Sequence, residues 1–119
     1  MLEHAPRTLL RIEGAALLGA ALALYIDADY SVLALVVLFL VPDLSFAAYA
    51  AGPATGSAVY NAVHTTLWPL VMGAAGVVGE SSTLTQVALI WLAHIGVDRA
   101  AGYGLKYPSA FKDTHLQRV

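Results

Sequence analysis

The stretch Trp91-Leu92-Ala93-His94-Ile95-Gly96-Val97-Asp98-Arg99-Ala100-Ala101-Gly102-Tyr103 places ionisable side chains within a strongly apolar helix. His94 and Asp98 are four residues apart, so on an α-helix they lie on one face. Ionisable groups are costly inside a bilayer, and there they face a polar partner or a water-filled cavity. The stretch therefore predicts that neighbouring helices bring polar groups to meet this face.

The composition of the whole chain indicates a membrane protein. The 119 residues are 59% hydrophobic and only 12% charged, and the mean hydropathy is +0.71. An ordinary globular domain is about 45–50% apolar and about 25% charged. A water-soluble chain this short buries too little of its surface to hide so much apolar area. A soluble helical bundle is the structural alternative.

Several classes of function are disfavoured by composition. The chain has no cysteine, which excludes disulfides, iron–sulfur clusters and thiolate metal sites. The net charge is −2 and no basic patch is present, so we expect no nucleic-acid partner. The richness in alanine, glycine, leucine and valine is compatible with a bacterial source.

Apolar segments recur four times along the chain. A membrane-spanning helix needs about 20 apolar residues. The segments cover residues 9–26, 32–51, 57–79 and 84–104, and a polar, basic tail follows at 105–119. Pro42 and Pro69 interrupt the second and third segments and predict kinks there. We therefore expect an all-α fold, an integral membrane four-helix bundle that forms one domain over residues 1–119.

The first segment also carries a ridge of small residues. Ala15, Gly19 and Ala23 recur every four residues and so lie on one side of a helix. Small residues at this spacing let two membrane helices approach closely. We expect this ridge to contact a neighbouring helix.

The positions of the basic residues predict the orientation. The connections at 27–31 and 80–83 carry only acidic charges. All six basic side chains lie near the two chain ends, at Arg7, Arg11, Arg99, Lys106, Lys112 and Arg118. Lysine and arginine collect on the cytoplasmic side of membrane proteins. We therefore expect a multi-pass protein of the cell (inner) membrane with both termini in the cytoplasm.

Polar residues of the four segments fall at a similar depth. Counting about 1.5 Å per residue along each helix places Asp43, His64 and His94 about 10–15 Å inside the cytoplasmic boundary. Asp98 and Asn61 lie about one turn nearer the cytoplasm. Glu13 enters the first segment at a similar level. The sequence thus predicts a polar cluster in the cytoplasmic half of the bundle.

A metal site is one interpretation of this cluster. Imidazole and carboxylate ligands suit divalent transition metals, so the predicted ligands are His64, His94, Asp98 and Asp43. Around them we expect Asn61 or Glu13 to hold a free ring nitrogen, with Arg99 nearby. An open coordination position would permit hydrolysis of a lipid-linked substrate by metal-activated water. No catalytic residue is identified by the sequence.

Two other interpretations use the same residues. The polar groups can instead hydrogen-bond across the helices and serve helix packing, in a structural or accessory subunit that contacts a homo-oligomer or a larger membrane complex. They can instead form a proton or ion relay, because histidine titrates near neutral pH and interrupted helices occur in transporters. Four spans are few for a transporter, so a relay would require an oligomer.

Five blocks of the sequence resemble the signatures of a known family. They are Pro42-Asp43-Leu44-Ser45, Tyr60-Asn61-Ala62-Val63-His64-Thr65, His94-Ile95-Gly96-Val97-Asp98-Arg99, Gly102-Tyr103-Gly104-Leu105-Lys106-Tyr107 and Phe111-Lys112-Asp113-Thr114-His115-Leu116. The family consists of short bacterial membrane proteins known only as a domain of unknown function. The resemblance covers nearly the whole chain and implies a four-span membrane protein, but it implies no activity.

Fewer residues are similar to the membrane-bound metal-dependent hydrolases. Those enzymes also combine a Pro-Asp turn with histidine and aspartate residues on short membrane helices. The chain lacks their histidine-rich His-Arg…Thr-His run. We therefore expect a non-enzymatic role, with metal-dependent hydrolysis as an alternative.

Overall fold

Residues 5–101 fold into helices joined by short connections. A computed structural model describes residues 5–106 and 115–118, and over these residues the fold is all-α, with no strand. The elements are α1 (Ala5–Asp27), α2 (Val32–Leu38), the 3-10 helix η2 (Val41–Ala51), α3 (Pro53–His64), α4 (Leu67–Val78), α5 (Ser82–Ala101) and α6 (His115–Arg118).

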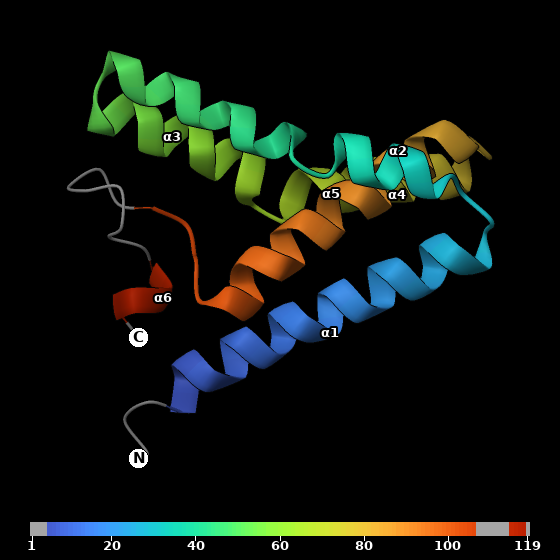
Figure 1. The fold of residues 1–119 in the computed structure, drawn as a ribbon, viewed down its shortest axis with the longest axis horizontal. Coiled ribbons are helices and arrows are strands. Elements are labelled where there is room, and N and C mark those ends of the chain that lie inside the picture. The colour runs from blue at the N-terminus through green and yellow to red at the C-terminus, as the bar shows by residue number, and fades with distance from the viewer. Residues whose placement is uncertain (1–4, 107–114, 119) are drawn as a thin grey trace.

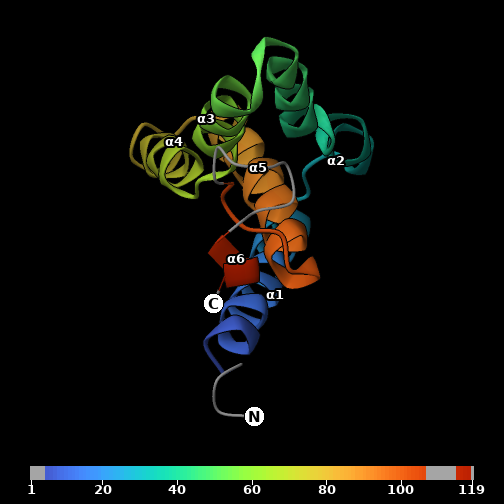
Figure 2. The same cartoon turned by 90° about the vertical axis from the view of Figure 1, so that its left-hand side faces the viewer.

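Helix α5 lies at the centre of the arrangement. It packs against α1 and also against α4, while η2 packs along α3 (Figures 1 and 2). The N-terminal end of α1 and the C-terminal end of α5 lie at the same end of the molecule (Figure 1). There the Arg11 guanidinium Nε donates to the carbonyl oxygen of Ala100 at 2.9 Å. The α1–α2 and α4–α5 connections lie at the opposite end.

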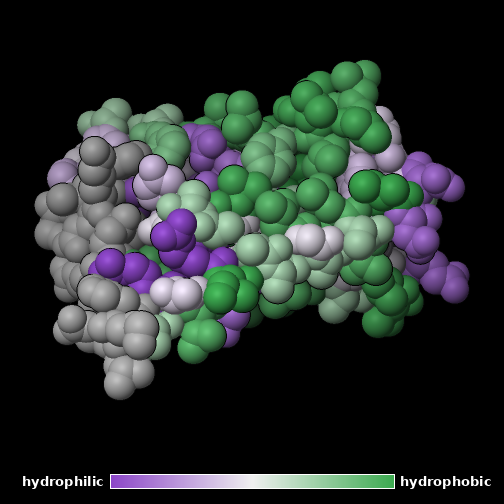
Figure 3. Space-filling view, turned by 60° about the horizontal axis from the view of Figure 1, so that its bottom comes forward, coloured by the Kyte–Doolittle hydropathy of each residue, from purple (hydrophilic) through white to green (hydrophobic). Residues whose placement is uncertain are grey.

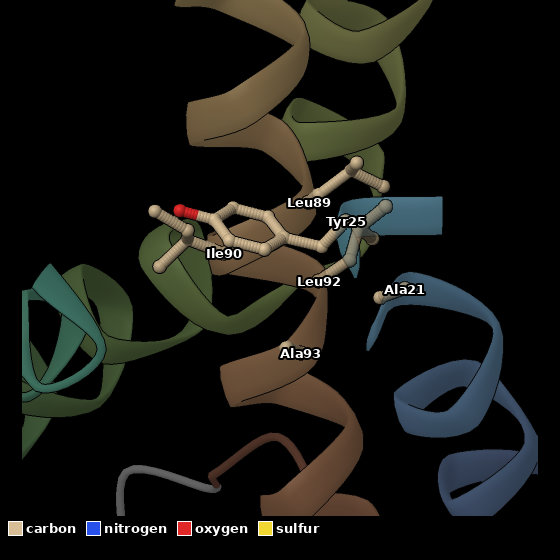
Figure 4. Close-up of a cluster of buried hydrophobic side chains, with 6 residues drawn as sticks. All are labelled: Ala21, Tyr25, Leu89, Ile90, Leu92 and Ala93. Carbon is tan, nitrogen blue, oxygen red and sulfur yellow. The ribbon is translucent and has the colours of Figure 1, made fainter. Parts of the chain in front are cut away.

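The contact between α1 and α5 forms the apolar core. Ala21 and Tyr25 of α1 lie against Leu89, Leu92 and their buried neighbours on α5 (Figure 4). The Tyr25 hydroxyl accepts a hydrogen bond from the Gln86 amide at 3.1 Å, so its polar end is satisfied as well.

Glycines bring α1 and α5 close together near the N-terminal end of α1 and the C-terminal end of α5. A Cβ on Gly14 would lie 2.3 Å from the Cβ of Arg99, and one on Gly96 would lie 2.7 Å from the backbone nitrogen of Leu18. The predicted ridge of small residues on α1 does not form this contact with α5. A Cβ placed on Gly19 would have no atom within 4 Å, and Ala15 is exposed. The helix is rotated so that Gly14, one residue earlier, faces α5.

The two proline-containing segments are broken rather than kinked. Between α2 and η2 the chain passes from α to 3-10 winding, and Asp43 N–H donates to the carbonyl oxygen of Leu40 at 3.0 Å. The predicted third span is two helices, α3 and α4, because Thr65 is extended, with φ −77° and ψ 142°. Proline has no N–H and clashes with the carbonyl four residues earlier, which accounts for a break just before Pro42 and Pro69.

Two helical segments are long and apolar enough to cross a membrane. They are Ala5–Asp27 and Val32–Ala51, and only 17% and 6% of their most apolar windows are buried. Such low burial is unlike that of an interior helix in a soluble protein. The described residues contain no other helix that meets this criterion. At 12 residues each, α3 and α4 are about 18 Å long, shorter than the roughly 30 Å hydrocarbon core.

The surface agrees with this apolar character. On the face shown in Figure 3, hydrophobic side chains cover the middle of the molecule and hydrophilic ones gather towards both ends. Of the predicted tail at 105–119, residues 107–114 and 119 lie outside the described residues, including Lys112.

Candidate metal centre

The four predicted ligands converge at one point. Asp43 stands at the start of η2, His64 ends α3, and His94 and Asp98 lie one turn apart on α5. One ligand atom from each lies within 4.8 Å of the other three. The site therefore joins η2, α3 and α5, and it lies where both broken segments meet α5.

The distances between ligand atoms suit one small ion. The Nε2 atom of His94 is 3.2 Å from that of His64, 3.1 Å from Asp43 Oδ1 and 3.4 Å from Asp98 Oδ2. The Nε2 atom of His64 is 3.6 Å and 3.5 Å from the same two oxygens. Tetrahedral zinc with bonds of about 2.0–2.1 Å sets its ligands about 3.3 Å apart. The five distances lie around that value.

The outer nitrogen of each imidazole ring is held by a backbone carbonyl. His64 Nδ1 lies 3.0 Å from the carbonyl oxygen of Tyr60, and His94 Nδ1 lies 2.6 Å from that of Phe39. A carbonyl oxygen only accepts hydrogen bonds, so both Nδ1 atoms carry the proton and both Nε2 lone pairs point inward. Metal-bound histidines are oriented by the same kind of outer hydrogen bond.

The inner atoms of the cluster are all acceptors. Two Nε2 lone pairs meet two carboxylate oxygens, and none of these four atoms brings a proton when the histidines are neutral. A cation at the centre, either a metal ion or a proton, removes the repulsion among them. The side chains of His64 and His94 are 3% and 2% exposed, whereas those of Asp43 and Asp98 are 34% and 23% exposed. The carboxylate side therefore gives an ion access to the centre.

The 3-10 winding of η2 explains why Phe39 can hold His94. In an α-helix, the N–H of Asp43 would bond to the carbonyl of Phe39, four residues earlier. Here that N–H bonds to Leu40 instead, which leaves the Phe39 carbonyl for His94 Nδ1. The Phe39 and His94 rings also lie in contact, with centroids 5.2 Å apart.

Side chains of α5 also bind carbonyls at the break between α3 and α4. Trp91 Nε1 donates to the carbonyl oxygen of Val63 at 2.6 Å, and Arg99 Nη2 donates to that of His64 at 3.1 Å. Helix ends leave carbonyls without partners inside the helix. Side chains of α5 thus bind the carbonyls that both breaks release.

Of the three residues predicted to surround the ligands, one contacts a ligand residue and two do not. Arg99 does reach the main chain of His64. Asn61 does not hold a ring nitrogen, because its amide pairs with the backbone of Lys106, donating at 2.7 Å and accepting at 2.6 Å. Glu13 is exposed on α1 and is not part of the cluster. The ring nitrogens are held by carbonyls, which sequence reasoning missed because a carbonyl carries no residue signature.

The C-terminal segment is attached beside the site. The Lys106 ammonium lies 4.6 Å from the centre of the Tyr60 ring, which in turn stacks on His64 with centroids 3.7 Å apart. His115 Nδ1 accepts the N–H of Leu105 at 2.8 Å and lies 3.4 Å from Arg99 Nη1. Burial lowers the pKa of Lys106, and burial together with the charge of Arg99 lowers the pKa of His115.

These features define an all-α protein with two candidate membrane-spanning helices and a buried His/Asp cluster that can hold a metal ion. The chain belongs to the family described as "Domain of unknown function (DUF4260)", which matches residues 7–119. This confirms the resemblance to a domain of unknown function. No curated protein and no solved structure matches the chain.

Proposed function

We propose that the chain is a metal-binding membrane protein whose four clustered side chains hold one divalent transition metal ion. The supporting observation is the inner set of four acceptor atoms, five of whose mutual distances are close to those around tetrahedral zinc, with both rings fixed from outside. Zinc suits two imidazole nitrogens and two carboxylate oxygens in this geometry. The ligands are His64, His94, Asp43 and Asp98.

The ligand count favours a metal that holds helices together. Structural zinc sites are closed by four protein ligands, whereas catalytic sites keep a position for water. Here four side chains supply a full tetrahedral set, so the ion would join η2, α3 and α5. Hydrolysis would require one of the partly exposed carboxylates to give up its position, and we do not propose an enzyme.

The proposed setting is the inner membrane of a bacterium, with four crossings and both termini in the cytoplasm. Support comes from the two apolar segments and from the ends of α1 and α5, which lie together and carry Arg7, Arg11 and Arg99. In this setting the broken segment α3–α4 and helix α5 provide the third and fourth crossings. Retention in the membrane pellet after alkaline carbonate extraction tests the location, and release into the supernatant contradicts it.

Metal content tests the centre. The detergent-purified full chain should carry about one transition metal ion per chain by mass spectrometry. His64→Ala and His94→Ala should each lose it. The matched control is His115→Ala, which removes a histidine outside the cluster and should keep the ion. A wild-type chain that stays free of metal after incubation with zinc, while keeping its helical circular dichroism, contradicts the proposal.

A proton is the second candidate for the central cation. It also satisfies an all-acceptor cluster, and interrupted helices line ion sites in transporters. This reading is favoured by the same two breaks, between α2 and η2 and between α3 and α4. It predicts a folded, metal-free protein in which the cluster conducts protons in an oligomer, so the metal measurement separates the two.

A further inference from the structure

An apolar groove lies beside the metal centre. Its volume is about 560 Å³, and its walls come from residues 38–45, α3 and α5. The side chains that line it are apolar apart from the hydroxyl of Ser45 and the indole N–H of Trp91, and the latter is already bonded to Val63. Pockets of about 300–1,000 Å³ with few polar groups are typical of small-molecule sites.

The groove opens on the outer surface of the molecule. Val41, Leu44 and Val59 line it and are themselves exposed, whereas Pro42 and Ile90 are buried. About half of its wall belongs to the segment Val32–Ala51, one of the two candidate membrane spans. An apolar wall of this kind offers water few hydrogen-bond partners. In a bilayer, the surrounding medium that can enter is hydrocarbon.

One polar atom in the wall lacks a partner. The Oγ atom of Ser45 is buried and has no hydrogen-bond partner among the described residues. Buried hydroxyls are nearly always paired, because an unpaired one loses its bond to water without compensation. Ser45 lines the groove, and rotation about its Cα–Cβ bond would turn the hydroxyl towards an acceptor there. A single donor in an otherwise apolar wall fits a ligand with one carbonyl oxygen on a long alkyl chain.

We propose that this groove binds one acyl chain, with Ser45 donating a hydrogen bond to the carbonyl oxygen of its ester or carboxyl group. The occupant in the cell would be a membrane lipid. Pro42 and Val63 line the groove and directly precede the ligands Asp43 and His64, so an acyl chain seated there lies next to the metal centre. This inference goes beyond metal binding and does not require the metal.

Tryptophan fluorescence offers a direct measurement. Trp91 lines the groove, whereas Trp68 is half exposed on α4 and lies outside it. Trp68→Phe leaves Trp91 as the only tryptophan. Brominated palmitic acid, added to this full-length protein in detergent, should quench Trp91 with saturation at about one molecule per chain. The companion protein Trp91→Phe, which keeps only Trp68, should show no saturable quenching.

Groove-filling variants test the location. Val59→Phe and Val87→Phe each extend a ring into the groove from different helices, and each should weaken the saturable quenching by at least about tenfold. Val78→Phe makes the same change at an exposed position outside the groove and should leave the affinity unchanged. Helical circular dichroism and metal content are measured on all three variants.

The proposed hydrogen bond is tested by removing the Ser45 hydroxyl in one experiment and the carbonyl group of the ligand in another. Ser45→Ala should weaken binding of brominated palmitic acid about fivefold, the usual loss for one hydrogen bond. It should not weaken binding of a brominated alkane of the same length, which has no carbonyl. Ser57→Ala removes a hydroxyl that already bonds to the carbonyl of Ala54, and it should change neither affinity.

Four results overturn the proposal. The first three are quenching that never saturates, equal quenching of Trp91 and Trp68, and folded groove-filling variants that bind as well as the parent protein. A cross-linked dimer that Val59→Phe abolishes, without any lipid binding, would assign the groove to a second copy of the chain and also overturns it. Loss of metal binding, with saturable quenching retained, overturns the proposed metal centre and leaves the groove assigned. Release of the protein by carbonate overturns the proposed membrane location, on which this inference rests, and with it the membrane lipid as occupant.

Discussion

Each histidine in the cluster is fixed at one ring nitrogen by a carbonyl and presents the other inward. Nε2 of His64 and of His94 therefore meet at 3.2 Å without a proton between them when both rings are neutral. Two carboxylates add negative charge at the same point. Such an arrangement is stable with a cation and repulsive without one. The chemistry of individual atoms thus supports a cation site more directly than the residue types do.

Replacing one carboxylate tests the charge of the site. Asp98→Asn keeps the shape of the side chain but removes one negative ligand, so zinc affinity should fall by at least about 100-fold, more than the loss for an outer-shell change. Competition with a chromophoric chelator measures it. Glu80→Gln, an equal change of charge in the α4–α5 connection, should have no effect. Equal affinity in wild-type and Asp98→Asn proteins would remove Asp98 from the site.

The environment of His115 in the C-terminal segment predicts that the stability of this segment depends on pH. Its Nδ1 accepts the N–H of Leu105 and lies near the cationic Arg99, so burial and this charge lower its pKa. The fold favours the neutral ring, and the stability gained is therefore present above the unfolded pKa of about 6.5 and is lost as the pH falls through the folded value.

Hydrogen exchange at α6 should therefore accelerate as the pH falls below about 6.5, after correction for intrinsic rates. In His115→Gln the corrected rates should be independent of pH over the same range. Exchange at α6 that does not change with pH in the wild-type protein would contradict this role of His115.

At the scale of the helices, the breaks in the two proline-containing segments position the metal centre. The 3-10 register of η2 frees the Phe39 carbonyl, and Pro42 stands at the point where the α-helix would have to continue. Pro42→Ala allows α winding, in which Asp43 N–H competes with His94 for Phe39. We expect zinc affinity to fall by about 10–100-fold and helical circular dichroism to rise.

Pro53→Ala is the matched control for this substitution. Pro53 is exposed and begins α3, where its missing N–H has no helical partner to lose. We expect no change in zinc affinity or helical signal. A Pro42→Ala protein with wild-type affinity would show that the break does not position His94.

The α1–α5 contact predicts a contrast between two glycines of one helix. Gly14→Ala places a Cβ against the Arg99 Cβ and the backbone of Ala100, which should lower the free energy of unfolding by about 1–3 kcal/mol. Gly19→Ala meets nothing and should raise it by up to about 1 kcal/mol through helix propensity. Unfolding in mixed detergent measures both. Equal effects would show that the two helices do not pack through Gly14.

Elements could be predicted from the sequence better than the contacts between them. The positions of the apolar segments and the shared depth of Asp43, His64 and His94 anticipated their convergence. The facing side of α1 could not be predicted, because a rotation of one residue exchanges Gly14 for Ala15. The Phe39 carbonyl that orients His94 depends on the winding at Pro42, which residue identities do not specify.

At the scale of the whole molecule, the path of the chain bears on the number of membrane crossings and on the side at which the chain ends. Both breaks fall in the middle of segments that cross the molecule, and the ends of α1 and α5 lie together (Figure 1). A chain with four crossings must return to the side from which it started. Arg7 and Arg11 of α1 bond to Leu116 and Ala100 at that side, as the proposed cytoplasmic termini require.

The absence of cysteine makes this topology directly testable. Single cysteines at exposed positions, Ala28→Cys and Thr83→Cys, mark the α1–α2 and α4–α5 connections, and Ala54→Cys marks the η2–α3 connection. In intact cells a membrane-impermeant maleimide should label the first two and spare the third, which should react only after the membrane is opened. The zinc content of each cysteine variant is also measured, so that a variant with a disturbed fold is recognised.

The pattern of labelling separates four crossings from the alternatives. If only α1 and the segment Val32–Ala51 cross, residues 54 and 83 lie on the same side of the membrane and both escape the reagent, while residue 28 reacts. If the orientation is inverted, residue 54 alone reacts. Reaction at 28 and 83 but not at 54 requires a crossing through the broken segment α3–α4 and another through α5. The metal centre would then lie within the membrane, held by three of the four crossing segments.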